Sequence, residues 1–260
     1  MSRIREELKE VPPAPRLAVL WAIPRSLSTA FAKAMSLAPT VQLVHEPWTD
    51  AYYFSPGRRS CRYGLGTPYQ QTADGNAIES QLERFAVECG CFVFVKELAF
   101  QALPFVSSDF IAGVQNAFII RHPALVHKSL AQLKPDYNEE EFGFQSVDSL
   151  VRTAQSLGKT PIIVDAEQFR EYPDAIMSRF CAIVGVAFEE SMLSWETGAI
   201  RNWTAGERFS QAKWHKDLEA SNGINRVESL DLSRPVDVDP GTYDRALDVY
   251  ERLLGLANCV

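Results

Sequence analysis

A loop rich in hydroxyl side chains, with one arginine, is the part of this sequence that most directly suggests a chemistry. It follows the apolar run Leu17–Ile23 and leads into an expected helix over Thr29–Ala38. Such a loop directs backbone N–H groups, hydroxyls and the positive end of a helix dipole at one point, and that combination binds phosphate groups. We therefore expect a function built on a phosphorylated ligand. The loop consists of Pro24, Arg25, Ser26, Leu27, Ser28 and Thr29.

The loop differs from the one that binds nucleoside triphosphates. That motif is G-x-x-x-x-G-K-[S/T]. When Thr29 is aligned with its final hydroxyl, Ser28 stands where the lysine would be, and the cation lies three residues earlier, at Arg25. The loop has no glycine, and no strand ends in an obvious magnesium-binding acidic motif. Phosphoryl transfer from ATP is therefore the weaker prediction.

Four further apolar runs predict strands, and polar residues follow each of them. The runs are Val41–Val44, Phe92–Val95, Ala117–Ile120 and Pro161–Val164. The residues that follow them are His45 and Glu46, Lys96, Arg121, and Asp165. Helical spacing or helix end signals predict further helices over Ile78–Glu88, Pro123–Leu133, Ser146–Leu157, Pro173–Val184 and Thr242–Leu254.

Strands that alternate with helices predict an α/β fold, with a parallel sheet and helices on both faces in three layers, as in P-loop proteins. Ligands bind such sheets at the carboxyl ends of the strands, so the polar residues that follow the strands should gather along one edge. Residues 1–16 are charged and then proline-rich, and we expect an arm outside the core. Residues 17–260 are expected to form a single domain.

Two segments are less regular. Residues 49–75 form a long stretch rich in aromatic residues and arginine, typical of a functional loop such as a lid over a substrate, although local packing explains the rings equally well. Residues 196–240 are polar and have no assigned elements. The aromatic and basic residues of the first segment include Tyr52, Tyr53, Phe54, Arg58, Arg59, Arg62, Tyr63 and Tyr69.

The composition limits the classes of function. Hydrophobic residues make up 46% of the chain, enough for a substantial core, and the net charge of −7 argues against binding to nucleic acid or to acidic membranes. No apolar run reaches the roughly 18 residues that span a bilayer, and no apolar segment follows Met1 as a secretion signal would require. The five cysteines share no framework spacing, so we expect reduced thiols in the cytoplasm and no metal site.

The phosphate loop and a second motif together resemble the sulfotransferase family. These enzymes use 3′-phosphoadenosine 5′-phosphosulfate (PAPS), and their 5′-phosphosulfate loop is commonly P-[K/R]-S-G-[S/T]-T. The stretch from Phe118 to Ser129 resembles the family's 3′-phosphate element, a strand followed by R-x-P and a later serine. A third stretch, from Val164 to Gly198, resembles a segment of bacterial members. The resemblance covers residues 17–200.

The resemblance implies a role for each matching residue. The side chains and backbone of Arg25, Ser26, Leu27, Ser28 and Thr29 would bind the 5′-phosphosulfate. Arg121 and Ser129 would bind the 3′-phosphate. The chain departs from the family at Leu27, where a glycine is usual, and it lacks the R-K-G-x-x-G-x-W-K pattern of the cytosolic members. The segments around Trp203 and from Lys213 to His215 are only faint echoes of that pattern.

Sulfuryl transfer needs a cation for the charge that builds on the bridging oxygen and a base for the acceptor hydroxyl. Arg25 is the predicted cation. Glu46 is the first candidate for the base, since related bacterial enzymes place a glutamate after the second strand, and His45 is the rival; their side chains should point opposite ways. Lys96 either reaches the transferred sulfonate or is simply solvated.

Other polar residues have a structural explanation. We expect Asp165 to cap the element after its strand, and His122 and His127 to be exposed to solvent without a functional role.

The leading hypothesis is thus a cytoplasmic sulfotransferase that moves a sulfuryl group from PAPS to a hydroxyl of a small molecule and releases adenosine 3′,5′-bisphosphate (PAP), without a metal. Two alternatives stay open at this point. One is a kinase-like enzyme that uses ATP, and the other is a binding protein that kept the fold and lost turnover. The sequence names neither the acceptor nor the oligomeric state.

Overall fold

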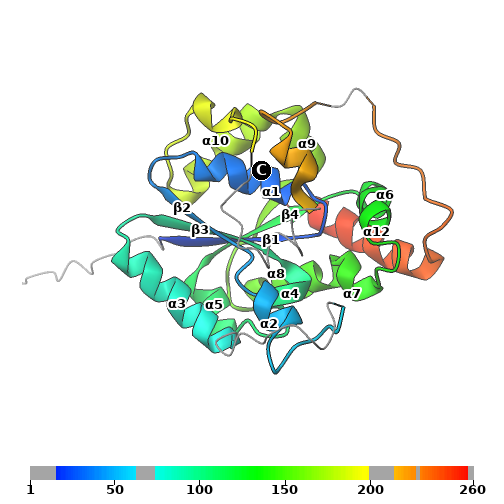
Figure 1. Cartoon of the computed structure of the whole chain (residues 1–260), viewed down its shortest axis with the longest axis horizontal. Coiled ribbons are helices and arrows are strands. Elements are labelled where there is room, and N and C mark those ends of the chain that lie inside the picture. Colours follow the sequence, from blue (N-terminus) through cyan, green and yellow to red (C-terminus); the bar gives the residue numbers. More distant parts are fainter. Residues whose placement is uncertain (1–15, 63–73, 199–213, 227–228, 257–260) are drawn as a thin grey trace, which may run out of the picture.

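A computed structural model describes residues 16–62, 74–198, 214–226 and 229–256 of the chain. Its centre is a five-stranded sheet in the order β2-β3-β1-β4-β5, and every pair of neighbouring strands is parallel (Figure 1). The fold is therefore the α/β fold expected from the alternation of strands and helices. The strands are β1 (Leu17–Ala22), β2 (Val41–His45), β3 (Phe92–Leu98), β4 (Gln115–Ile120) and β5 (Ile162–Asp165).

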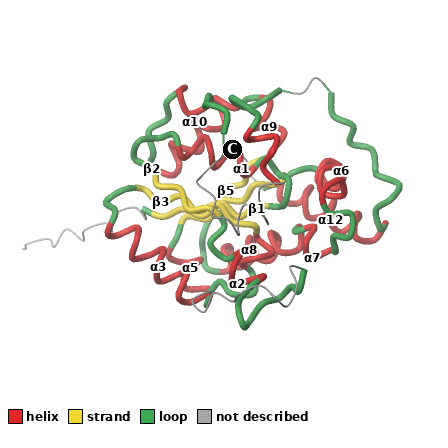
Figure 2. Tube along the Cα trace, in the orientation of Figure 1, coloured by secondary structure: helices red, strands yellow, loops and turns green. Residues whose placement is uncertain are grey.

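The helices lie in two layers, one on each face of the sheet (Figures 1 and 2). On one face, α1 (Ser28–Ser36) and α10 (Pro173–Val184) pack against the sheet around Phe31 and Phe180. The other face is covered by α3 (Gly75–Glu88), α5 (Ser108–Gly113), α8 (Phe144–Ser156) and α12 (Pro240–Leu254), among others. Two apolar clusters thus form the core, one on each side of the sheet.

The central strand shows why the sheet is so apolar. All six residues of β1 are buried, because strands β3 and β4 flank it and helices cover both of its faces. Its last residues are in register with the ends of both neighbours, so that Ala22 lies beside Leu98 and Ile119. The chain therefore leaves β1 at the edge where the neighbouring strands also end.

The predicted long elements are confirmed, and the short ones were missed. All five strands are present, and α6 (Pro123–Leu133) and α10 have the predicted bounds. The helices that were missed are short, and a periodic pattern does not reveal them, since isolated helices below about 12 residues carry little signal of their own. The missed elements are α2 (Thr49–Tyr53), within the stretch expected to be irregular, α4 (Ala99–Ala102), α5, α7 (Glu139–Phe142), α9 (Ala166–Glu171) and the 3-10 helix η1 (Glu190–Leu193).

One expectation about the cysteines is wrong. Cys89 and Cys91 form a disulfide, where the sequence suggested reduced thiols throughout. Gly90 lies between them with φ +65°, and this tight turn brings the two Cα atoms to 5.2 Å. Cys61 and Cys181 are free, and Cys259 lies outside the described residues, as does the expected arm over residues 1–15.

Candidate functional site

The phosphate loop leaves the carboxyl end of β1 with an unusual backbone. Arg25 and Leu27 both have φ of 62°, in the left-handed region. The buried hydroxyl of Ser26 donates to the carbonyl of Ile23 at 2.6 Å, which ties the loop back to the end of the strand. Leu27 is the N-cap of α1 and gives it no side-chain cap. The first N–H groups of α1 are therefore left for water or a ligand.

Leu27, the residue of the phosphate loop that departs from the family pattern, has a left-handed backbone. Glycine adopts positive φ without cost, whereas another L-residue there costs roughly 1–2 kcal/mol. Leu27 nevertheless holds φ at 62° and packs its side chain against the core around α1. The loop thus has the backbone conformation that glycine usually supplies.

A glycine from another element fixes the start of this loop. Gly143 joins α7 to α8 with φ +87°, and a Cβ there would lie 2.6 Å from Cδ of Pro24. No other residue fits so close to the proline ring. The contact seats the first residue of the phosphate loop on the start of α8.

Arg121 and Ser129, both predicted from the second motif, lie beside the loop. Nε of Arg25 donates to Oγ of Ser129 at 2.9 Å, and Nη1 of Arg121 donates to the carbonyl of Arg25 at 2.8 Å. Arg121 also pairs with Glu167 at 3.0 Å. The ends of β1 and β4 therefore bring Arg25 and Arg121 into one cluster. Ser129 belongs to the same cluster, although it lies 104 residues from Arg25 in the sequence.

Arg25 is the less neutralised of the two guanidinium groups, because Glu167 pairs closely with Arg121. Burial lowers the pKa of Arg25, Asp217 opposes that effect, and the like charge of Arg121 lowers the pKa further. Asp217 is highly exposed and lies 4.0 Å from Nη2 of Arg25, so it neutralises the guanidinium only weakly. An anion bound to Arg25 and Arg121 would relieve their repulsion.

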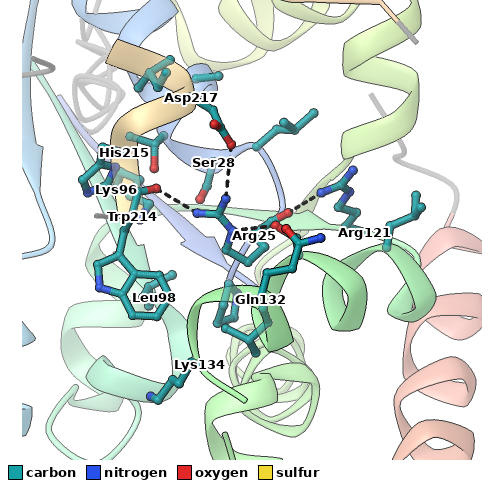
Figure 3. Close-up of a pocket in the computed structure, with 18 of the residues that line it drawn as sticks. Arg25, Ser28, Lys96, Leu98, Arg121, Gln132, Lys134, Trp214, His215 and Asp217 are labelled. Carbon is teal, nitrogen blue, oxygen red and sulfur yellow. Dashed lines mark hydrogen bonds and ion pairs between the residues drawn. The ribbon is translucent and has the colours of Figure 1, made fainter. Parts of the chain in front are cut away.

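A cavity of about 580 Å³ opens over these residues (Figure 3). Six of the residues that line it are lysine or arginine and four are acidic, so the cavity is net positive within a chain of net charge −7. Of the predicted site residues, those that line the cavity are Arg25, Leu27, Ser28, Thr29, Glu46, Lys96, Arg121 and Ser129. Ser26 and His45 are not among the lining residues.

Glu46 and Lys96 form a buried ion pair at this cavity. Lys96 lies within β3, opposite His45 of β2, and does not follow the strand as predicted, because β3 continues to Leu98. Burial alone would raise the pKa of Glu46, but the charges of Lys96, His45 and His215 outweigh it and lower that pKa. Glu46 is therefore held as a carboxylate and is a weak proton acceptor.

A second buried carboxyl group supports the turn that carries Glu46. Glu97 is fully buried and accepts hydrogen bonds from the backbone N–H groups of Trp48 and Leu98, both at 2.7 Å. Glu46 has a φ of 49°, and the hydrogen bond that the N–H of Trp48 donates to Glu97 fixes the chain just beyond Glu46. Burial, and then the charge of Glu46, raise the pKa of Glu97 well above its ordinary value.

A distant segment, residues 214–226, closes one side of the cavity. It begins with a short helix over residues 214–219, and the carbonyl of Trp214 accepts from Nη1 of Arg25 at 2.8 Å. In Figure 3, Trp214, His215 and Asp217 lie together beside Arg25. Sequence reasoning missed this segment because its only signal was the faint echo near Trp214.

Aromatic rings and an ion-pair cluster also line the cavity. Tyr53 and Phe54, from the stretch suggested as a lid, line the cavity together with Phe100 and Trp214. Lys134 and Glu141 also line it, and Glu141 is bound by Arg62 at 2.9 Å as well as by Lys134. Tyr63 and Tyr69 lie outside the described residues. Sequence reasoning also missed Arg170, Gln101 and Lys134, which belong to no recognised motif.

The remaining polar residues have structural roles. Asp165 caps α9 through the N–H of Gln168, as predicted. His122 caps α6, but His127 is buried, with Tyr137 and Asp237 at its two ring nitrogens, so the expectation of solvent exposure is wrong for His127. Among the described residues, no group of three or more His, Cys, Asp or Glu is placed to hold a metal ion. Within the same residues, no helix is long and apolar enough to cross a membrane.

The decisive comparison is with protein families. The family model described as a sulfotransferase domain matches residues 17–239, which include the phosphate loop, the Arg121 cluster and the segment 214–226. The chain belongs to the sulfotransferase domain family. Membership of this family agrees with the resemblance read from the two phosphate motifs.

Two solved sulfotransferase domains share the fold. The one from the Synechococcus PCC 7002 olefin synthase is 14% identical, with a TM-score of 0.51 over 92% of this chain and 94% of that one. The one from the curacin biosynthetic pathway is 12% identical, with a TM-score of 0.55 over 89% of this chain and 95% of that one. At these identities the likeness concerns the fold alone.

Two curated relatives come from Arabidopsis thaliana. Branched-chain-amino-acid aminotransferase-like protein 2 is 22% identical over 222 residues, and protein 1 of the same name is 21% identical over 244 residues. The alignments cover 83% and 92% of this chain but only 37% and 40% of those proteins. The sulfotransferase-like chain thus corresponds to less than half the length of either relative.

Proposed function

We propose that this member of the sulfotransferase family is an enzyme that transfers a sulfuryl group from PAPS to a hydroxyl group of a small molecule. The observation that carries the proposal is the Arg25–Ser129–Arg121 cluster. It gathers two guanidinium groups and a hydroxyl at the carboxyl ends of β1 and β4, beside the start of α1. Two cationic groups there suit a ligand with phosphate at both the 5′ and 3′ positions.

The size and charge of the cavity support the same donor. Its volume of about 580 Å³ lies within the range of pockets for small ligands. In the proposed arrangement, the N–H groups at the start of α1 and the side chain of Arg25 bind the 5′-phosphosulfate. Arg121 and Ser129 bind the 3′-phosphate. The chemistry needs no metal, because arginine and lysine supply the positive charge.

The transfer itself exchanges one S–O bond for another. The acceptor oxygen forms a bond to sulfur as the bond from sulfur to the bridging phosphate oxygen breaks, and the electron pair stays on the 5′-phosphate of PAP. In the proposed mechanism, Arg25 and Lys96 stabilise the charge that develops there. Glu46 holds Lys96 in position through their ion pair. The aromatic end of the cavity, with Tyr53 and Trp214, is left for the acceptor.

Calorimetric titration with PAP tests the donor site, with adenosine 5′-monophosphate and ATP as comparison ligands. We expect tight binding of PAP, much weaker binding of the monophosphate, and a loss of about 10- to 100-fold in PAP affinity for Arg121→Ala, because a hydrogen bond to a charged group contributes roughly 1.5–3 kcal/mol. The matched control is Arg152→Ala, since Arg152 is an exposed arginine on α8. It should leave the affinity unchanged.

The comparison ligands also separate the alternatives. Equal affinity for PAP and the monophosphate would show that no 3′-phosphate site exists. Binding of ATP alone, with magnesium-dependent turnover, would replace the proposal with a kinase-like activity. Tight PAP binding without conversion of PAPS in the presence of any acceptor or water would favour a binding protein that lost turnover.

A further inference from the structure

The segment 214–226 contributes a histidine to the cavity that the sequence indicated only through a faint echo of a family pattern. His215 lines the cavity, with an exposed fraction of 5%. Its ring meets the ring of His45 edge to face, with centroids 5.4 Å apart. Trp214, the residue just before His215, accepts a hydrogen bond from Arg25 through its backbone carbonyl. The same short segment therefore supplies the imidazole of His215 and contacts Arg25, the cation expected to bind PAPS.

His215 is better suited to take a proton than the two candidates from the sequence. Glu46 lines the cavity but is paired with Lys96, and it accepts at 3.4 Å from the hydroxyl of Thr49. His45 is not among the residues that line the cavity. An imidazole with an ordinary pKa of about 6.5 matches the task of a base near neutral pH, whereas a carboxylate held by a lysine does not.

One neighbour of His215, the carboxylate of Glu46, favours the protonated form of its ring. Glu46 is near enough for the charge of His215 to lower the pKa of Glu46, and the same interaction favours an imidazolium at His215. Among the described residues, charged or titratable groups nearby include His45 at the end of β2, Lys96 in β3, which is paired with Glu46, and Lys216, Asp217 and Glu219 on its own segment. A carboxylate beside a histidine is a recurrent means of stabilising the charge formed when the ring accepts a proton.

We propose that His215 is the general base of the reaction, with Glu46 beside it to stabilise the imidazolium. This inference rests on the proposed sulfuryl transfer and specifies its proton path. As the acceptor oxygen bonds to sulfur, its proton passes to the unprotonated ring nitrogen of His215. The electron pair of the breaking S–O bond stays on the 5′-phosphate of PAP. With water as the acceptor, the products are PAP and sulfate, and the released proton goes to the same ring.

The test uses the full chain and water as the acceptor, by following hydrolysis of PAPS to PAP across pH 5–9. We expect His215→Asn to lower the rate by about 100-fold, the lower end for general-base catalysis, while PAP affinity stays within about threefold. The wild-type rate should rise with pH through the pKa of the base and then level off, and that rise should vanish in His215→Asn. His122→Asn is the matched control, since asparagine also caps a helix and His122 does not line the cavity.

A second measurement does not depend on turnover. The chain has four histidines, so their ring signals can be followed by NMR as pH is varied and assigned with the two asparagine variants. Glu46→Gln removes the charge that favours the imidazolium, and we expect the pKa of His215 to fall in that variant. The acidic side of the rate profile should move to lower pH in parallel.

The outcomes separate the two proposals. No binding of PAP by the wild type would mean that the donor proposal has failed. PAP binding with a rate in His215→Asn within threefold of wild type, or with the same pH dependence, would overturn the role of His215 alone. If hydrolysis by the wild type is too slow to follow, the NMR titration decides. An unchanged pKa of His215 in Glu46→Gln would then overturn the proposal, and a fall in that pKa would support the pairing of His215 with Glu46.

Discussion

Three residues other than glycine hold a left-handed backbone in the described part of the chain, and all three lie at the proposed site. They are Arg25, Leu27 and Glu46, with φ between 49° and 62°. Each such position costs of order 1–3 kcal/mol and persists only where the surrounding contacts enforce it. Ser26 and Ser129 hold the loop through hydrogen bonds, and Glu97 holds the turn after Glu46. Backbone strain thus coincides with residues that line the cavity.

Leu27 offers a direct measure of this strain. Leu27→Gly and Leu27→Ala remove the same apolar contacts, so their difference isolates the backbone. We expect the glycine variant to be more stable by about 1 kcal/mol, because alanine keeps the cost of positive φ. Urea denaturation of the two variants measures the difference.

The control for Leu27 lies one turn further on, inside α1. Ala30→Gly should destabilise the protein by roughly 0.5–1 kcal/mol, the usual order of alanine and glycine in a helix. If Leu27→Ala proved as stable as Leu27→Gly, the left-handed conformation at this position would be wrong.

At the residue scale, the sequence predicted the parts of the site that follow strands or belong to motifs. Arg25, Arg121 and Ser129 lie together as the two phosphate motifs required. His215 could not be predicted, because the position of its segment depends on tertiary packing, and Arg170, on the helix that follows β5, belongs to no recognised motif. Neither side chain is recognisable as a site residue until the chain has folded over the sheet.

At the scale of elements, the phosphate loop depends on Gly143, a residue that is not among those lining the cavity. The junction of α7 and α8 presses Gly143 against Pro24, and the loop then runs on to α1. The long helices around this contact were predictable from their periodicity. The short helix α7 was not, although a capping box between Asn138 and Glu141 begins it.

Gly143→Ala should disturb the loop in a way that a second glycine does not. Gly143 and Gly158 both have positive φ, at +87° and +73°, but only at Gly143 does a Cβ meet another atom within 4 Å. We expect Gly158→Ala to cost about 1 kcal/mol from the backbone alone, and Gly143→Ala to cost about 1–3 kcal/mol more from overlap with the proline ring. Denaturation midpoints measure both.

The same pair of variants reports on binding. PAP affinity should fall several-fold in Gly143→Ala, because the loop starts at the displaced Pro24, and it should stay unchanged in Gly158→Ala. Equal effects of the two substitutions on affinity would mean that the contact between Gly143 and Pro24 does not position the loop.

At the scale of the whole molecule, the sheet brings together charges that are far apart in the sequence. Residues from Arg25 to Asp231 line one cavity, because parallel strands end at a common edge and the segment 214–226 folds back over it. The alternation of strands and helices predicted that edge. The sequence held no comparable signal for the return of the distant segment, or for the burial of a second carboxyl group next to Glu46.

That second carboxyl group, Glu97, makes the stability of the molecule depend on pH. Its pKa is raised in the folded protein above the ordinary value of 4.5, so between these two values the folded chain keeps a proton that the unfolded chain has released. The contribution of Glu97 to stability is therefore present at low pH and is lost as pH rises, by up to about 1.4 kcal/mol per pH unit within that range.

Glu97→Gln should remove this dependence, since the amide does not ionise. We expect the free energy of unfolding of the wild type, relative to that of the variant, to decrease as pH rises from 5 to 8 in urea denaturation series. Other groups titrate in both proteins and largely cancel in the difference. A difference that stays constant, or one that grows with pH, would contradict the burial of a neutral carboxyl group at this position.

The hydrogen bonds of Arg25 carry a consequence for turnover. Ser129 and the carbonyl of Trp214 are internal partners for the same guanidinium that a bound phosphate would use, and Asp217 stands nearby. When the product leaves, the charged guanidinium of Arg25 would keep hydrogen-bond partners, since Ser129 and Trp214 can accept from its N–H groups in place of the phosphate. Release of the spent nucleotide, often the slow step of a transferase cycle, would then be hastened by the protein itself at a cost in affinity.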